Sequence, residues 1–208
     1  FGWIETFFEE QFRRFGKGNT VISKGLFHRA QGLGINEKDL LLLRPGINGD
    51  GIEQLSTFEA RQRLRMGHSG FLVGFGSQDT FLDMSELVKG FRLFSQNEPS
   101  AKLLILGKVT NQLKRSFREH ELEHLVIMPG FVSHEDYPYY LQACNTLVVP
   151  FSEKNYNLGR WPNKFGDYLL SGRPIVFNAY GDLKDFVRDD GPGINCEFHA
   201  EAFQNSFA

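Results

Sequence analysis

NYNLGRWPNKFGDYLLSGRPIV, residues 155–176, runs from a polar loop through a short helix into an apolar strand. Proline fits the first turn of a helix, because the amide that it lacks would be unpaired there, so Pro162 marks the start of a helix predicted over 162–171. Gly172 is a typical left-handed stop, and the β-branched residues after it favour a strand. The stretch therefore predicts a loop, a helix and a strand in succession.

Four polar side chains in this stretch follow one another at three- and four-residue steps and would share one helix face: Arg160, Lys164, Asp167 and Ser171. Phe165 and Leu169 fall on another face, suited to packing on a sheet. Two cations beside the free amides of a helix start make a place for a diphosphate, so Arg160 and Lys164 are predicted as catalytic cations. Asp167 can accept hydrogen bonds from sugar hydroxyls. The alternative is a solvated surface helix.

The composition indicates an ordinary soluble globular protein, with 208 residues, 41% hydrophobic and 23% charged. A net charge of −2 argues against nucleic acid as a partner. Cys144 and Cys196 match no metal or redox spacing, so we expect no metal site and a reducing, cytoplasmic compartment. No apolar run approaches the roughly 20 residues of a membrane span. The H-E-x-x-H pattern at 120–124 leaves no room for one helix before the next strand, which disfavours a zinc site.

Short apolar strands alternate with helical segments along most of the chain, which predicts a doubly wound, parallel, Rossmann-like α/β fold. The predicted strands cover about 19–23, 39–44, 69–75, 102–107, 125–130, 146–151, 174–178 and 193–198; the strand at 39–44 is expected to be buried. The predicted helices cover about 3–15, 24–31, 55–66, 81–95, 109–120, 135–143, 162–171 and 182–188, with a last helix at the end. In such sheets, ligands lie beyond the carboxyl ends of the strands.

Three of the loops at that rim contain candidate ligand-binding residues. Gly74 and Gly76 follow a strand and precede a helix, so their amides could cradle a phosphate, although a tight turn explains them equally. Phe131 could flank a base, or belong to the core. The loop 150–159 is long and polar, and long loops in compact domains tend to be functional; Asn157, Leu158 and Gly159 at its end are candidate binding residues.

At these positions the sequence resembles the glycosyltransferases of the large retaining group called family 4. The resemblance rests on VISKGLFHRAQGLGI, the PGIN loop, LLILG, the block from PGFVSHED to NTLVVPF, and above all GRWPNKFGDYLLSGRPIV. It implies a GT-B architecture, of which this chain would be the C-terminal half. Residues 1–44 would then be the closing helices and strand of an N-terminal acceptor domain plus the linker, and residues 45–208 the donor-binding domain.

The resemblance also implies an activity: transfer of a hexosyl group, with retention, from a UDP- or GDP-sugar without a required metal or other cofactor. Asp167 aligns with the family's ribose-binding glutamate. Gly159 aligns with the glutamate that contacts the donor sugar, which is a departure from the family. Leu158 and Gly159 match positions near the phosphates, and Phe131 and Val132 match the loop that meets the base. The family's usual cations after the first domain strand are missing from GFGSQDT. We infer, apart from the resemblance, that Arg160 and Lys164 supply that charge from the opposite side.

The implied partners are the nucleotide-sugar donor, a saccharide or lipid-linked acceptor, and a missing N-terminal domain. They suit an enzyme of polysaccharide or glycolipid synthesis at the inner face of a membrane, in peripheral contact with it. Two alternatives stay open: a degenerate nucleotide-binding or interaction module, and a sugar-nucleotide epimerase of the same architecture.

Overall fold

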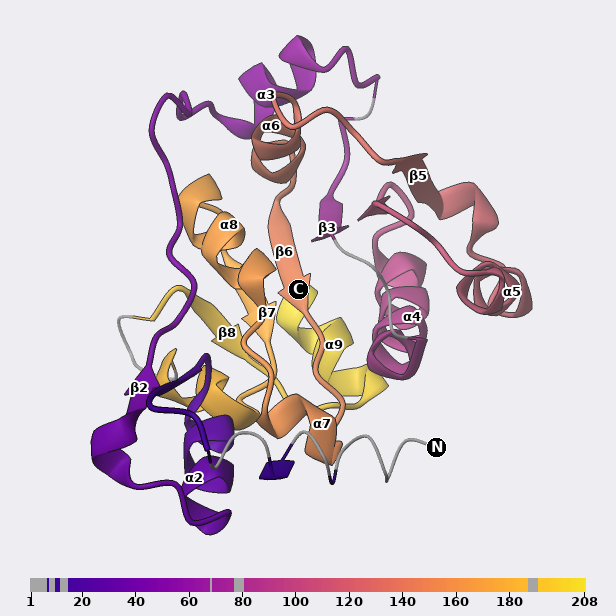
Figure 1. The fold of residues 1–208 in the computed structure, drawn as a ribbon. Coiled ribbons are helices and arrows are strands. Elements are labelled where there is room, and N and C mark those ends of the chain that lie inside the picture. Colours follow the sequence, from indigo (N-terminus) through magenta and orange to yellow (C-terminus); the bar gives the residue numbers. More distant parts are fainter. Residues whose placement is uncertain (1–6, 8–9, 12–14, 68, 77–80, 187–190) are drawn as a thin grey trace.

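The computed structural model describes residues 7, 10–11, 15–67, 69–76, 81–186 and 191–208. A six-stranded parallel sheet in the order β5-β4-β3-β6-β7-β8 forms its centre (Figure 1). The strands of this sheet are β3 (Leu72–Gly76), β4 (Lys102–Leu106), β5 (Val126–Gly130), β6 (Thr146–Val149), β7 (Ile175–Phe177) and β8 (Gly193–Asn195). The alternation of strands and helices in the sequence predicted all six.

The strand order makes the sheet doubly wound. The chain enters at β3, builds outward to β5, then returns to lay β6 beside β3 and continues to β8 at the other edge. Every residue of β3 and of β6 is buried, as expected for parallel strands covered on both faces. The predicted Rossmann-like α/β fold is therefore confirmed, and its strand order reverses between β3 and β6.

Helices cover both faces of this sheet, and each face has its own apolar core. One core joins the sheet to α4 (Phe81–Asn97), α5 (Asn111–Glu119) and α9 (Ala200–Phe207). The other joins it to α6 (Tyr137–Gln142) and α8 (Asn163–Ser171). The remaining helices are α2 (Lys24–Gly32), α3 (Thr57–Arg63) and α7 (Asn155–Leu158), with short 3-10 turns η1 (Glu37–Asp39), η2 (Glu123–Leu125) and η3 (Gly181–Phe186). Figure 1 shows α8 and α9 on opposite sides of β6 and β7.

The helix α8 begins one residue later than predicted, with Pro162 as its N-cap residue, and it ends at a left-handed Gly172 with φ 67°. The expectation that Arg160 shares a helix face with Lys164 is wrong, because Arg160 lies in the turn before the helix starts. Phe165 is buried in the core as predicted, whereas Leu169 is 36% exposed. The buried stripe of this nine-residue helix contains Phe165, Gly166, Tyr168 and Ser171 and excludes Leu169.

A second, two-stranded parallel sheet pairs β1 (Asn19–Val21) with β2 (Leu40–Leu42). The expected burial of the strand at 39–44 is wrong: Leu41 is 57% exposed, and the other two residues of β2 are only half-buried, because β2 is an edge strand of a two-stranded sheet. Most of the helix predicted over 3–15 lies outside the described residues. The division of the chain at residue 44 stays a prediction.

The H-E-x-x-H pattern does not form one helix face. His120 is the C-cap of α5, Glu121 has a left-handed φ of 58°, and His124 lies in η2. The expectation that the helix ends before the motif is complete is confirmed. The helix predicted over 182–188 is the 3-10 turn η3 within its described part. Among the described helices, none combines the length and apolar character that crossing a bilayer requires.

Candidate functional site

The candidate site lies at the carboxyl ends of β3 and β6, where the strand order reverses. Open parallel sheets bind ligands at such a point, because the loops from the two strands diverge there and leave a crevice. The chain leaving β6 forms the polar segment 150–160, which contains α7, and then enters α8. The sequence-predicted residues 157–167 therefore reach this rim from one continuous segment.

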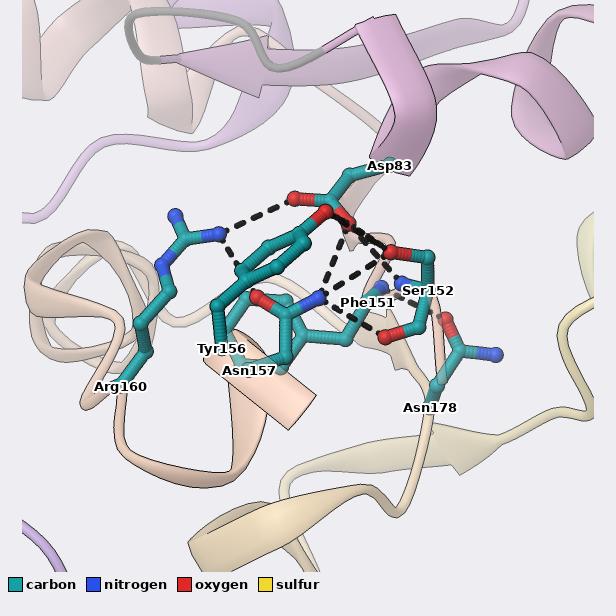
Figure 2. Close-up of polar contacts among 7 residues, drawn as sticks. All are labelled: Asp83, Phe151, Ser152, Tyr156, Asn157, Arg160 and Asn178. Carbon is teal, nitrogen blue, oxygen red and sulfur yellow. Dashed lines mark hydrogen bonds and ion pairs between the residues drawn. The ribbon is translucent and has the colours of Figure 1, made fainter. Parts of the chain in front are cut away.

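A buried carboxylate, Asp83 in the first turn of α4, holds the segment after β6 in place (Figure 2). It is 4% exposed. Its Oδ1 accepts hydrogen bonds from the amide of Ser152 at 3.0 Å, the hydroxyl of Tyr156 at 3.3 Å and the side-chain amide of Asn157 at 2.9 Å. The Ser152 hydroxyl donates to the same oxygen. The Phe151 amide donates a hydrogen bond to Asn178 Oδ1 at 3.0 Å. The segment is therefore held at Phe151 by Asn178 and from Ser152 to Asn157 by Asp83.

Arg160 is part of the same cluster. Its NH1 donates to Asp83 Oδ2 at 3.0 Å and to Asn157 Oδ1 at 2.8 Å, and its guanidinium carbon lies 5.1 Å from the Phe151 ring centroid. The side chain is 37% exposed. The predicted cation therefore lies at the rim, where its contacts with Asp83, Asn157 and Phe151 hold its position. Asn157, another predicted binding residue, is fully buried, and its side chain bonds Asp83 and Arg160.

Lys164, in the first turn of α8, is partly buried with its Nζ 3.8 Å from the centroid of the Phe75 ring. Burial, and to a smaller extent the charge of Arg160, lower the pKa of this ammonium to about 7, while the charge of Asp83 opposes the change. Phe75 lies near the end of β3, so the Lys164 ammonium lies at the carboxyl end of that strand. A lysine in this state gains a proton readily when an anion approaches it.

Asp167 lies one turn after Lys164 on the same side of α8 and lines two adjoining cavities. The cavity that extends toward the loop after β5 has a volume of about 400 Å³. Its walls are Leu106, Gly107, Phe131, Val132, His134, Tyr137 and Asp167. Burial raises the pKa of Asp167, while hydrogen bonding with Tyr137 and the charge of His134 oppose that change. The structure therefore brings Phe131 and Val132, predicted from the sequence, to the same cavity as Asp167, and Phe131 is 77% exposed there.

The turn at Leu158 and Gly159 packs against the start of α2. The Ser23 hydroxyl donates to the Gly159 carbonyl at 2.9 Å. A Cβ on Gly25 would lie 2.0 Å from the Leu158 carbonyl oxygen, and a Cβ on Gly159 would lie 3.1 Å from the Leu26 side chain. The space beside Gly159 is thus occupied by the Leu26 side chain of α2, which would have to shift by a few tenths of an ångström to admit a Cβ.

Gly74 and Gly76 lie inside β3, so the expectation that they form a loop is wrong. A Cβ on Gly74 would come within 2.4 Å of Cys144 Sγ, which makes this glycine a packing requirement. The Gly76 amide donates to the Tyr168 hydroxyl at 2.8 Å. Because that amide is already bonded, a phosphate cradle from these two glycines has no support in the local geometry. Their predicted binding role stays a prediction.

Chemically, the site offers two cations, Arg160 and Lys164, and the Asp167 carboxylate, which lines a cavity of about 400 Å³. Cations at a helix start stabilise phosphate oxygens, and a carboxylate one turn further accepts hydrogen bonds from sugar hydroxyls. No group of three or more His, Cys, Asp or Glu side chains within metal-binding reach occurs in the described part of the chain.

Sequence reasoning did not single out Asp83 or the contact between α2 and the turn at Gly159. The signal at Asp83 is weak, since an acidic residue in the first turn of a helix is common for reasons of helix dipole alone. Its partners lie at least 69 residues further along the chain.

The architecture is that of the C-terminal domain of GT-B glycosyltransferases. The HepE protein of Anabaena in complex with UDP and glucose superposes with a TM-score of 0.75 at 17% identity, over 94% of this chain and 53% of that one. The sucrose-phosphate synthase of Thermosynechococcus elongatus gives 0.69 at 18% identity, over 95% of this chain and 50% of that one. The C-terminal domain of the group 1 glycosyl transferase LpcC from Francisella tularensis gives 0.60 at 13%, over 77% and 85%.

The chain belongs to the glycosyl transferases group 1, whose family model matches residues 83–208. It spans about half the length of the structures HepE and sucrose-phosphate synthase. A search of curated protein sequences returned no significant match.

Proposed function

We propose that this chain is the donor-binding half of a retaining hexosyltransferase of the family 4 type. It binds a UDP- or GDP-sugar at the rim between β3 and β6, with no metal or other cofactor. Lys164 and Arg160 neutralise the diphosphate, and Asp167 accepts hydrogen bonds from the ribose. The acceptor, a saccharide or a lipid-linked saccharide, binds a further domain of a longer protein.

The observation that carries this proposal is the placement of Lys164 and Asp167 one turn apart on α8, with Asp167 lining a cavity whose other walls come from the end of β4, the loop after β5 and Tyr137. Breaking the bond between a sugar and a diphosphate leaves negative charge on the departing nucleotide. A cation fixed at that point stabilises the charge as it develops, and therefore lowers the barrier. The binding of UDP by HepE is consistent with such a ligand.

Calorimetric titration of the purified 208-residue chain with UDP, GDP and their sugars tests the proposal. We expect binding of one of the two nucleoside diphosphates and of its sugar conjugate. Absence of binding by every nucleotide would favour the interaction module, and release of free epimerised sugar would favour the epimerase. Membership of the glycosyl transferase family favours the transferase over both.

Replacing Asp167 with alanine is expected to weaken nucleotide binding about tenfold, the loss of one to two hydrogen bonds to a charged acceptor. Affinities for UDP and 2′,3′-dideoxy-UDP, measured by calorimetry on the wild-type chain and the variant, check the role of the ribose. The wild-type chain should prefer the ribonucleotide, and the variant should not. The matched control is Glu153→Ala, an exposed carboxylate of the same rim; an equal loss in both variants would contradict the assignment.

Nucleotide affinity is expected to fall as the pH rises from about 7 to about 9. The free chain has a Lys164 pKa of about 7, and a bound diphosphate stabilises the ammonium and raises that pKa. The contribution of the Lys164 charge to nucleotide affinity is therefore fully present below the Lys164 pKa of the free chain. It is lost as the pH rises to the Lys164 pKa of the bound chain. Nucleotide phosphate itself titrates lower, near pH 6.

Calorimetry in buffers of different ionisation enthalpy measures this effect as proton uptake on binding near pH 8. Lys164→Arg, which stays charged, should remove the uptake. Uptake that persists in this variant would assign the titration to another group.

A further inference from the structure

We propose that Asp83 is a positioning residue that fixes the Arg160 guanidinium in the orientation that receives the diphosphate. This inference rests on the proposed donor-binding function. It adds a residue from α4 that contacts no ligand itself and acts through Arg160. The Asp83 carboxylate does so by dividing its two oxygens between two tasks, as Figure 2 shows.

The first oxygen holds the backbone and side chains of the segment after β6. Asp83 Oδ1 accepts hydrogen bonds from Ser152, Tyr156 and Asn157. The second oxygen, Oδ2, pairs with Arg160 NH1 at 3.0 Å. Asp83 is 4% exposed, and the four hydrogen bonds that its Oδ1 accepts hold the carboxylate in one orientation. The carboxylate therefore holds the Arg160 guanidinium in one orientation as well.

The Arg160 side chain requires a partner that fixes its conformation. It lies in the turn between α7 and α8, outside any helix, and a free arginine side chain has about 2 kcal/mol of rotamer entropy to lose on binding. The hydrogen bonds from Arg160 to Asp83 and Asn157 both use NH1. Figure 2 shows the other terminal nitrogen of Arg160 pointing away from Asp83. Ordering the side chain before the ligand arrives removes that cost from the binding step.

Two effects of losing the Asp83 charge oppose each other. Removing a negative charge makes the rim more positive, which strengthens attraction to a diphosphate. Releasing Arg160 into solvent weakens its directed hydrogen bonds to phosphate oxygens, which are the stronger part of such contacts. The second effect is expected to dominate, because the Arg160 side chain is 37% exposed and the attraction from an added net charge is screened there by solvent and salt.

Asp83→Asn separates the two tasks of the carboxylate. The asparagine oxygen can keep the four donors on the Oδ1 side, and the amide nitrogen then faces Arg160 NH1, where two donors cannot bond. We therefore expect the variant to retain the conformation of the segment after β6 and to lose the hydrogen bond to Arg160. Tyr156→Phe is the matched control, because it removes one donor from Oδ1 and leaves the hydrogen bond to Arg160 intact.

The test is a double-mutant cycle on the 208-residue chain, with affinities for UDP and for uridine measured by calorimetry. We expect Asp83→Asn to weaken UDP binding about tenfold, in the range of a charge-assisted hydrogen bond, and to change uridine binding less than about twofold. In an Arg160→Gln background, Asp83→Asn should change UDP binding less than about twofold. Tyr156→Phe should leave both affinities unchanged. Tighter UDP binding by Asp83→Asn, or an equal loss in both backgrounds, overturns the proposal.

A measurement without ligand separates this inference from the proposed function. The Arg160 Nε–Hε signal, observed by nitrogen-15 relaxation, should show an ordered side chain in the wild-type chain and in Tyr156→Phe, and a mobile one in Asp83→Asn. If the wild-type chain binds no nucleotide, the donor-binding function fails, whatever the relaxation shows. If Arg160 is as ordered in Asp83→Asn as in the wild type, the positioning role fails, whatever the affinities show.

Discussion

Replacing Lys164 with methionine is expected to weaken UDP binding about a hundredfold near pH 6.5, because a charge-assisted contact in a partly buried site is worth up to about 3 kcal/mol. The same variant is expected to raise the melting temperature of the free chain. Methionine packs against Phe75 with a similar unbranched chain and carries no charge to desolvate. A calorimetric titration with UDP and a thermal melt of the same samples measure the two effects.

The sign of the stability change follows from the Lys164 pKa, which is about 7 in the folded chain against the ordinary lysine value of 10.5. Between these values the unfolded chain binds more protons, so stability rises with pH in that window. Below pH 7 the cost of the buried ammonium is fully present, and methionine removes it. The gain in melting temperature should therefore be largest near pH 6 and shrink toward pH 10.

The control for Lys164→Met is Lys154→Met, an exposed lysine of the same rim segment. It changes the net charge equally, so it reports on general attraction between the chain and an anion. We expect a change in UDP affinity below about threefold, since exposed charges are screened by solvent and salt. A Lys164→Met variant that loses stability and keeps its UDP affinity would show that the lysine is a structural element.

Gly90→Ala is expected to lower the free energy of unfolding by about 2–3 kcal/mol, the usual cost of overpacking a tight contact. Gly90 lies in α4 where this helix packs on α9, and a Cβ there would come within 2.6 Å of both the Ala200 carbonyl oxygen and Phe203 Cβ. The carbonyl belongs to the backbone of α9, so the helices must separate. The gain in helix propensity, about 1 kcal/mol, is smaller than this cost.

Gly32→Ala is the matched control for Gly90→Ala. Gly32 is the last residue of α2, and a Cβ there meets nothing within 4 Å. Thermal and denaturant unfolding should show a melting temperature about 5–10 °C lower for Gly90→Ala, given the usual scaling for a chain of this size, and an unchanged or slightly higher value for Gly32→Ala. Equal melting temperatures for the two variants would mean that α4 and α9 do not approach each other this closely.

Much of the fold could be predicted because its signals are local. The apolar composition of KLLIL and TLVV predicts that these strands are buried. Gly172 predicts the end of α8, because glycine readily adopts the left-handed conformation of a helix stop. Two errors came from the same locality. A helical spacing that includes Arg160 assumes that the helix already exists at that residue. A run of leucines at 40–43 indicates a strand, and does not indicate whether a second layer covers it.

The candidate site divides in the same way. Lys164 and Asp167 could be found from the sequence, because one helix turn fixes their relative placement. Phe131 could be found because strand ends in a parallel sheet meet at one rim, and Val132 was named through the family resemblance. Asp83 could not, since its link to Arg160 spans 77 residues. The filling of the space beside Gly159 could not either, since Ser23 reaches that residue across 136 positions.

The sequence by itself therefore determined the doubly wound sheet, the helix α8 and the two polar residues on it, because periodicity and turn chemistry act between near neighbours. Only the tertiary structure decided which residue holds Arg160, what occupies the place beside Gly159, and that Gly74 and Gly76 belong to a strand. These outcomes depend on side chains from distant segments that share one small volume. Close packing, which no local pattern encodes, selects among the partners that fit there.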